Sequence, residues 1–207
     1  MSQFFAMLFR MKHIQRWALM RNTRTENLSE HSLEVSIIAH LLALLKNERF
    51  GGELVPERAA VLALFHDASE ILTGDMPTPV KYFNPGIRQA YREVEDVARE
   101  KLLTMLPGDL RDSYRELLVP EEKEAELWAI IKAADKLSAL IKCVEERQMG
   151  NLEFLEAEQA QLEALRRMER PEVDCFLEEF LPAFQFTVDR LKQPEQDEPV
   201  PKTFPLI

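Results

Sequence analysis

The sequence has 207 residues, and its 26 Lys and Arg against 36 Asp and Glu give a formal net charge of −10. This acidic balance argues against a nucleic-acid polymer as partner, because such binding depends on a basic surface. Two cysteines exclude a disulfide scaffold and fit thiols in a reducing cytoplasm. No apolar stretch approaches the roughly 18 residues of a membrane span; the longest candidate, 35–45, is interrupted by Ser36 and His40. We therefore expect a cytoplasmic protein with no membrane partner.

The charge is unevenly distributed along the chain. Residues 1–25 hold five basic residues and no Asp or Glu, so this segment carries +5 while the remainder carries −15. An Arg-rich, acid-poor N-terminus is typical of a transit peptide, but the segment has no small-residue cleavage pattern and runs directly into a predicted helix start. The alternative interpretation is a site for an anionic ligand.

Helical patterns begin near the N-terminus, where apolar residues in 4–14 fall near one helical face. Asn27 and Glu30 have the spacing of a capping box and predict a second helix over 29–47. Pro56 fits the first turn of a third helix, which we expect to continue to about residue 72. The spacing predicts four residues on the buried side of the second helix: Leu33, Ile37, Leu41 and Leu44.

The rest of the chain also reads as helix. The prolines in 74–79 make a stiff loop, and no stretch alternates long enough to predict a strand. Further helices are predicted at 84–105, 110–117, 121–148, 152–167 and 171–191. We therefore expect an all-α fold, with one bundle of about seven to eight helices over residues 1–192. A flexible, Pro-rich acidic tail is expected over 193–207.

Candidate chemistry starts at His66 and Asp67, which follow an apolar run. A charged Asp in such a place is rarely buried unless it is paired or binds a metal. Glu70 lies three residues after Asp67 and four after His66, so all three side chains can reach one side of a helix. The competing interpretation is an ordinary polar pair on a helix surface.

Two more candidates come from other predicted helices. Asp135 lies in an apolar context, although it has an alternative as an exposed residue that pairs with Lys132 or Lys136. His31 lies near the start of the second helix. Four side chains on three helices then offer two imidazoles and two carboxylates: His31, His66, Asp67 and Asp135. Cysteine-free ligation of this kind suits one catalytic divalent ion such as cobalt, manganese, iron or zinc.

These residues belong to motifs that resemble a known family. The motifs are Arg16-Trp17, RNTRTENLSEHS at 21–32, HDASE at 66–70 and GDMPTPVKY at 74–82. In this order they are similar to those of the HD-domain metal-dependent phosphohydrolases and, more closely, of the bacterial 5′-deoxynucleotidases of the YfbR type. The resemblance covers about residues 1–190. One minor departure is Met76, where a leucine is usual.

The resemblance implies a cytoplasmic homodimer, with one HD domain per chain, that hydrolyses deoxyribonucleoside 5′-monophosphates to deoxyribonucleoside and inorganic phosphate. It implies that the metal ligands are His31, His66, Asp67 and Asp135, and that Glu70 is the catalytic acid. The substrate contacts that it implies are Arg16, Trp17, His31, Asp75, Met76, Pro77, Thr78 and Asp135.

Physical chemistry agrees with these roles. A bound divalent metal ion would activate the water that attacks the phosphate. Arg16 can make a forked contact with a phosphate. Trp17 either forms a pocket wall with its ring, donates through its indole N–H, or is a core aromatic. Glu70 can protonate the leaving sugar oxygen if burial raises its pKa.

Other functions stay open at this point. The same site can act on a different nucleotide phosphoester, either a triphosphate or a cyclic nucleotide, or it can bind a nucleotide without hydrolysis. A helical interaction protein with residues 153–170 as its contact face is a further alternative. However, the mixed charge of that stretch is typical of a solvated helix. His13 and His40 have no ligand spacing, which favours a single metal ion. Base preference is left open.

Overall fold

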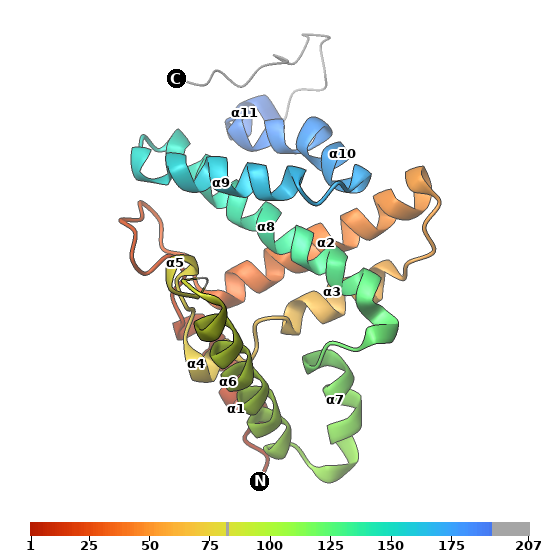
Figure 1. Cartoon of the computed structure of the whole chain (residues 1–207). Helices are drawn as coiled ribbons and strands as arrows, with labels where there is room; N and C mark the ends of the chain where they lie inside the picture. Colours follow the sequence, from red (N-terminus) through yellow and green to blue (C-terminus); the bar gives the residue numbers. More distant parts are fainter. Residues whose placement is uncertain (82, 192–207) are drawn as a thin grey trace.

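The computed structural model describes residues 1–81 and 83–191, and these contain helices and no strand. The predicted all-α fold is therefore confirmed, whereas the predicted tail at 193–207 lies outside the described residues. Figure 1 shows the helices in chain order. Their bounds are α1 Phe4–Leu8, α2 Leu28–Phe50, α3 Pro56–Phe65, α4 Glu70–Thr73, α5 Thr78–Lys81, α6 Pro85–Thr104, α7 Arg111–Leu118, α8 Ala125–Gln148, α9 Leu155–Arg166, α10 Pro171–Glu179 and α11 Val188–Leu191.

Two apolar clusters hold these helices together. The larger is built around α2, α3 and α8, with α10 closing it. The smaller joins α1, α6 and the end of α7. Along α2 the chain passes from Leu28 in the smaller cluster to Val35 in the larger, and it passes back between Ala63 and Ala68. Both passages carry the candidate histidines, so the polar site lies where the two apolar clusters meet.

Local sequence determines where the main helices begin and end. The capping box is present: Asn27 Oδ1 accepts from the backbone N–H of Glu30, and the Glu30 carboxylate accepts from the N–H of Asn27. Gly51 ends α2 with φ of 67°, a conformation that glycine adopts without strain. Asn84 caps α6 in the same way as Asn27 caps α2, by accepting from Ile87 N at 2.8 Å.

The prediction of one continuous helix over 56–72 is wrong. Helix α3 ends at Phe65, a tight turn covers 66–69, and α4 begins at Glu70. In an α-helix the Ala63 carbonyl would accept from the N–H of Asp67. Here it is taken by His66, whose Nδ1 lies 2.7 Å away and whose backbone N lies 3.3 Å away. The backbone then continues with i→i−3 hydrogen bonds, and the turn redirects the Asp67 side chain.

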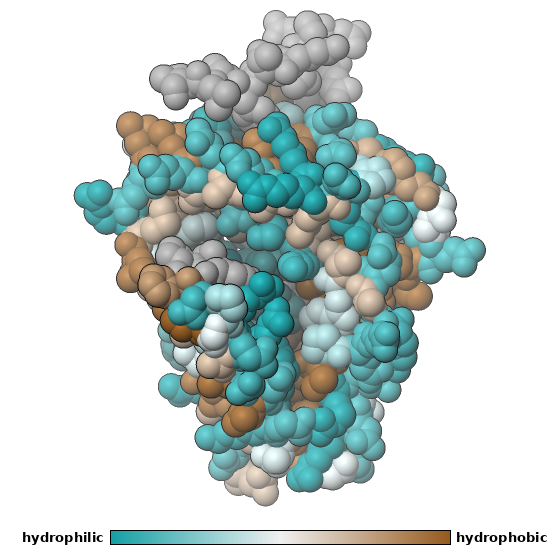
Figure 2. All heavy atoms as spheres, viewed as in Figure 1, coloured by the Kyte–Doolittle hydropathy of each residue, from teal (hydrophilic) through white to brown (hydrophobic). Residues whose placement is uncertain are grey.

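The predicted burial of one face of α2 is also wrong for three of its four residues; the fourth, Leu41, is partly buried against the larger cluster. Leu33 and Ile37 are 55% and 63% exposed, and Leu44 is 36% exposed. The buried side instead includes Val35 and Leu42. Helix α2 is apolar around most of its circumference, so spacing could not select the face; contacts with α3 and α8 did. Figure 2 shows that the face seen in Figure 1 is mainly hydrophilic, with separate apolar areas.

Helix α2 also bears on the expectation of no membrane span. It is the one helix in the described ranges that is long and apolar enough to cross a membrane by length and composition. However, 56% of its most apolar window is buried inside the protein. It is the central core helix of this fold, and it carries a buried histidine near its start.

The prediction of one continuous helix over 171–191 is also wrong. Helix α10 ends at Glu179, shortly before Leu181-Pro182, and α11 begins only at Val188.

A buried carboxylate fastens the loop before α2 to α8. Glu146 is 1% exposed, and it accepts hydrogen bonds from Thr23 N at 2.9 Å and Thr23 Oγ1 at 2.7 Å. Arg24 N and Asn151 Nδ2 also donate to it, and Lys142 forms an ion pair with it. Burial alone would raise the pKa of Glu146, but these partners lower it to about 2.

We expect Glu146→Gln to lower the Tm at pH 7 by about 5 °C, because hydrogen bonds to a charged group contribute about 1.5–3 kcal/mol. The pKa of the folded carboxylate is lowered. Its contribution to stability is therefore present above the unfolded value of 4.5 and is lost as the pH falls toward 2. The Tm difference should shrink below pH 4, as measured by circular dichroism. The exposed Glu145→Gln is the control; a Tm difference independent of pH would contradict the prediction.

Candidate metal centre and active site

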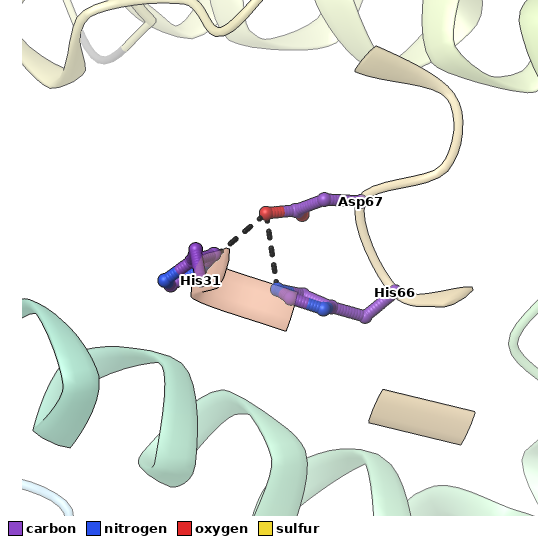
Figure 3. Close-up of side chains that lie close together, drawn as sticks. All are labelled: His31, His66 and Asp67. Atoms are coloured by element: carbon purple, nitrogen blue, oxygen red, sulfur yellow. Dashed lines mark ion pairs between the residues drawn. The ribbon is translucent and has the colours of Figure 1, made fainter. Parts of the chain in front are cut away.

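Three separate segments bring the candidate ligands together. His31 lies in the first turn of α2 and is fully buried, whereas His66 and Asp67 lie in the turn after α3. The Asp67 Oδ2 atom is 3.0 Å from His66 Nε2 and 3.7 Å from His31 Nε2. Figure 3 shows both imidazoles directed at this carboxylate. One ligand atom from each residue lies within 4.8 Å of the others.

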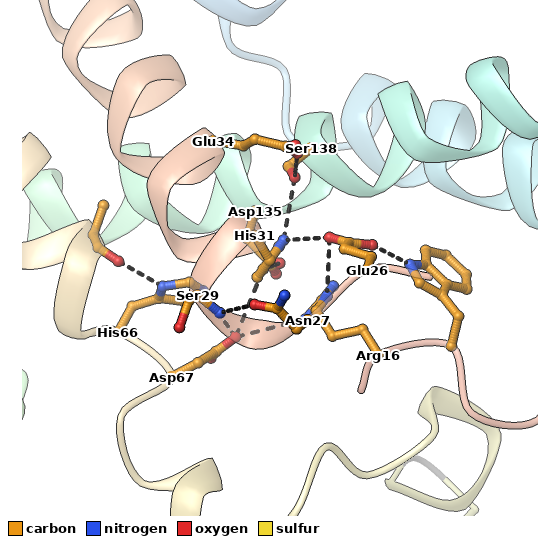
Figure 4. A network of polar contacts seen from close by, with 12 residues as sticks. Arg16, Glu26, Asn27, Ser29, His31, Glu34, His66, Asp67, Asp135 and Ser138 are labelled. Atoms are coloured by element: carbon orange, nitrogen blue, oxygen red, sulfur yellow. Dashed lines mark hydrogen bonds and ion pairs between the residues drawn. The ribbon is translucent and has the colours of Figure 1, made fainter. Parts of the chain in front are cut away.

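Asp135 lies beside this three-residue group, in the middle of α8. Its Oδ1 atom lies 3.1 Å from His31 Nε2 (Figure 4). The described ion pairs include none from Asp135 to Lys132 or Lys136, the alternative that the sequence left open. The helix therefore turns this carboxylate toward His31 and the turn after α3.

The nitrogen atoms of both histidines are prepared for a metal ion. His66 Nδ1 lies 2.7 Å from the Ala63 carbonyl oxygen, so its N–H donates there and the lone pair is on Nε2. His31 Nδ1 lies 3.1 Å from Ser138 Oγ, whose hydroxyl donates to Glu34. Both Nε2 atoms are buried, and each lies close to a carboxylate: Asp67 Oδ2 is 3.0 Å from that of His66, and Asp135 Oδ1 is 3.1 Å from that of His31. Two imidazole nitrogens beside two carboxylates fit a divalent transition-metal ion.

The site holds its carboxylates ionised. Burial alone would raise the pKa of Asp67, but the neighbouring His66 and His31 lower it to about 2. Burial opposes ionisation of Asp135 as well, and the His31 hydrogen bond more than compensates, so its pKa is also lowered. Burial and Arg16 favour neutral His31, yet Asp135 and Glu26 outweigh them and raise its pKa to about 9.

Glu70 has the opposite electrostatic environment. It is the first residue of α4 and is 5% exposed. Burial raises its pKa well above the ordinary value, and the negative charges of Asp67 and Asp75 act in the same direction. Its Oε2 atom is buried without a hydrogen-bond partner. Two carboxyl groups three residues apart therefore differ in protonation: Asp67 is ionised at neutral pH, and Glu70 retains a proton more readily.

A cavity of about 570 Å³ opens beside this group. Its lining includes eight of the site residues predicted from the sequence, but neither histidine: Arg16, Trp17, Asp67, Glu70, Asp75, Met76, Pro77 and Asp135. Asp135 lines it from α8. The side chain of Thr78 lies outside the described residues; its backbone begins α5.

Sequence reasoning missed the far wall of the cavity. Ala157, Ala160 and Gln161 of α9 line it, together with Ala139 of α8. The signal was present as two small residues three apart, which lie on one face of a helix. Nothing in the sequence indicated that this face of α9 meets the loop before α2. The polar stretch 153–170 was interpreted as solvated helix, and part of it forms the cavity wall instead.

Trp17, which lines the cavity, adopts an unusual backbone conformation. Its φ of 57° is rare for a bulky residue and costs on the order of 1–2 kcal/mol. The indole N–H donates to Glu26 Oε2 at 2.8 Å, and its ring centroid lies 5.4 Å from that of Phe154. Of the alternatives left open by the sequence, donation to a ligand is excluded in this conformation, because the N–H already has a partner. The ring remains available to the cavity.

An all-helical fold with this His and Asp group defines an HD-domain phosphohydrolase, and solved structures agree. An HD-domain phosphohydrolase from Listeria innocua shares the fold with a TM-score of 0.75 and 28% identity, over 88% of each chain. The cyanophage S-2L HD phosphohydrolase, described as bound to dA and one catalytic Zn²⁺ ion, has the same fold. Its TM-score is 0.61 at 18% identity, over 85% of this chain and 95% of that one.

The sequence comparisons give the family. The family model described as 5′-deoxynucleotidase YfbR-like matches residues 3–184. A 5′-deoxynucleotidase of Erwinia tasmaniensis is 50% identical over 192 residues, which cover 93% of this chain and 97% of that protein. The chain therefore belongs to the YfbR-like 5′-deoxynucleotidase family, as the motifs indicated.

Divalent ion binding tests the fit of this group directly. We expect His66→Ala and Asp67→Asn to abolish high-affinity Mn²⁺ binding in calorimetric titration, because each removes a donor that no neighbour replaces. His40→Ala, on the same helix as His31, is the control and should bind Mn²⁺ as the unchanged protein does. Normal Mn²⁺ affinity in either site variant would show that these residues do not hold the ion.

Proposed function

We propose that this protein hydrolyses deoxyribonucleoside 5′-monophosphates to deoxyribonucleosides and inorganic phosphate, using one divalent metal ion. The observation that carries the proposal is that the two carboxylates of the His and Asp group, Asp67 and Asp135, line a cavity that Arg16 and Glu70 also line. A candidate cation site, a guanidinium and a buried carboxyl with a raised pKa lie side by side, and phosphomonoester hydrolysis can use all three. The relatives' shared name, 5′-deoxynucleotidase, supports the same reaction.

The metal ion is held by two imidazoles and two carboxylates: His31, His66, Asp67 and Asp135. When bound, it acts as a Lewis acid on the phosphoryl group and activates water for attack. Cobalt, manganese or another transition metal fits this mixed nitrogen and oxygen donor set.

Arg16 binds the phosphate. The Arg16 side chain is 12% exposed. Its Nη1 atom lies 3.7 Å from Asp67 Oδ2, which places the guanidinium next to the proposed metal site. A planar guanidinium can contact two phosphoryl oxygens at once. Trp17 lines the cavity from the same loop. In this proposal His31 and Asp135 contact the substrate side as metal ligands.

The sugar and base occupy the rest of the cavity. Asp75, Met76 and Pro77 line it from the loop before α5, and Asp75 accepts from a sugar hydroxyl in this proposal. Thr78 is proposed as a contact from the resemblance alone. Ala157 and Ala160 of α9 also line the cavity, and their small side chains leave room for the base in this proposal.

Glu70 is the catalytic acid. Its buried carboxyl faces the cavity beside Asp67, and burial favours the protonated form that an acid requires. It gives this proton to the departing sugar oxygen. A sensor that only binds nucleotide has no need for a protonated carboxyl at this position.

Phosphate release over a panel of nucleotides, with and without Mn²⁺ or Co²⁺, tests the proposal. We expect inorganic phosphate from deoxyribonucleoside monophosphates only. Release of pyrophosphate or triphosphate, or opening of a cyclic nucleotide, would indicate the alternative phosphoester, and no release would indicate a binding module. Glu70→Ala should lower kcat by about 10²–10⁴-fold, while Mn²⁺ affinity stays unchanged. Loss of Mn²⁺ binding in this variant would show that Glu70 supports the metal site instead.

The assembly and the compartment follow as parts of the proposal. The protein acts in the cytoplasm on a small nucleotide, without a nucleic-acid polymer or a membrane as partner. It forms a homodimer through the exposed apolar stripe of α2 and its neighbour α3. The stripe consists of Leu33, Ile37, Leu44, Val61 and Leu64, which are all between 36% and 63% exposed. A second copy is the occupant because an apolar stripe along a helix can pair with itself about a two-fold axis.

We expect Ile37→Glu to halve the molar mass measured by light scattering, because it places a charge in the centre of the stripe. Val97→Glu on α6, where Val97 is 67% exposed, is the matched control and should leave the mass unchanged. A dimer that persists in Ile37→Glu would place the interface elsewhere.

A further inference from the structure

A single buried carboxylate lies between the phosphate-binding loop and the metal site. Glu26 precedes the cap of α2 and is 7% exposed. Its backbone carbonyl accepts from Arg16 N at 2.9 Å, beside an antiparallel bridge between Gln15 and Asn27. This bridge closes the loop 16–26 at its base. It therefore places Arg16 directly across from Glu26.

The Glu26 side chain contacts three residues of the site at once (Figure 4). Its Oε2 accepts from Trp17 Nε1 at 2.8 Å. Its Oε1 lies 3.3 Å from His31 Nδ1 and 3.4 Å from Arg16 Nε. Oε2 thus holds the Trp17 ring in place. Oε1 lies next to both the proposed phosphate-binding residue, Arg16, and the proposed metal ligand, His31.

Each contact acts on the side of its partner that faces away from the cavity. Glu26 reaches Nδ1 of His31, whereas Nε2 faces Asp67 and Asp135. It reaches Nε of Arg16, whereas Nη1 faces Asp67. A carboxylate behind a metal-ligating imidazole fixes the orientation of the ring and increases its basicity. The same charge offsets Arg16 from behind and leaves its terminal nitrogens directed at the site.

We propose that Glu26 is a positioning residue that couples the Arg16-Trp17 phosphate pair to the metal ligand His31. The roles that this inference gives to Arg16 and His31 rest on the proposed function, whereas its test measures binding and does not require hydrolysis. It also gives the left-handed backbone of Trp17 a role, because the indole bond to Glu26 and the Trp17 carbonyl, which accepts from Met20 N at 2.9 Å, hold this conformation in place. Glu26 thus couples the ordering of the loop 16–26 to the ordering of the His31 side chain.

Two titrations on the full-length protein test the coupling. Calorimetry with Mn²⁺ measures the metal site, and calorimetry with inorganic phosphate at saturating Mn²⁺ measures the Arg16 side. We expect Glu26→Gln to raise the Kd for Mn²⁺ by about 10- to 100-fold and the Kd for phosphate by about tenfold. Glu48→Gln, an exposed glutamate at the other end of α2, is the matched control and should change neither.

Two further variants separate positioning from a merely structural role. Ser138→Ala removes the other partner of His31 Nδ1 without contacting Arg16 or Trp17, so it should weaken Mn²⁺ binding and leave phosphate affinity unchanged. Trp17→Phe keeps a ring but removes the indole donor. Although Trp17 contacts no metal ligand in the described contacts, this variant should raise the Kd for Mn²⁺ about three- to tenfold through Glu26.

The outcomes are distinct. Unchanged Kd values in Glu26→Gln would overturn the coupling. If that variant does not fold, Trp17→Phe decides instead, and unchanged Mn²⁺ affinity there would overturn the coupling as well. Absence of phosphate release from monophosphates by the unchanged protein would refute the proposed function alone, because both titrations still measure the link between loop and metal site.

Discussion

Charged groups buried next to one another around His31 are the constraint on which the rest of this structure depends. A buried charge without a partner costs several kcal/mol, so each must be offset within contact distance. Arg16 lies against Glu26 and Asp67, and His31 lies against Glu26 and Asp135. These residues come from a loop, two helices and a turn. Mutual compensation is possible only when all of these segments converge, which links the fold to the site.

The boundary between the two apolar clusters provides the place for this convergence. An apolar cluster would exclude such a set of charges, and an open surface would hydrate it and separate the residues. At the boundary, α2 contributes His31 between Leu28 of one cluster and Val35 of the other. Helices α2, α3 and α8 are rigid there, so the donors are placed before any ligand arrives.

Ideal helical structure is abandoned at the positions that carry chemistry. The chain leaves helix α3 at His66 and makes a tight turn, which aims Asp67 at both imidazoles. Trp17 adopts a left-handed backbone conformation where the loop meets the cavity. Such strain persists only where surrounding contacts over-determine the local structure. The hydrogen bonds of Glu26 and Glu146 supply those contacts on either side of the loop.

The basic N-terminal segment separates into residues with different surroundings. Arg16 alone among its five cations lines the cavity, while Arg21 forms an ion pair with Glu153 and Arg10 is exposed. The segment is therefore not a uniform basic patch, and it packs into the fold rather than extending from it as a separate targeting peptide would. Its first part packs into the smaller apolar cluster, and its loop forms one wall of the cavity. In this acidic protein, one buried guanidinium therefore lies beside the candidate metal site.

Sequence by itself determined the all-helical class, the caps at Asn27 and Asn84, the family and the set of residues that meet at the site, because these depend on local spacing and on motifs. Tertiary structure alone decided which face of α2 is buried, since an all-round apolar helix has no preferred side. It also decided the break at His66, where a side chain takes a backbone carbonyl from its helix. The position of Glu26 behind His31, and the α9 wall, depend on contacts between segments far apart in the chain, which periodicity within one segment cannot encode.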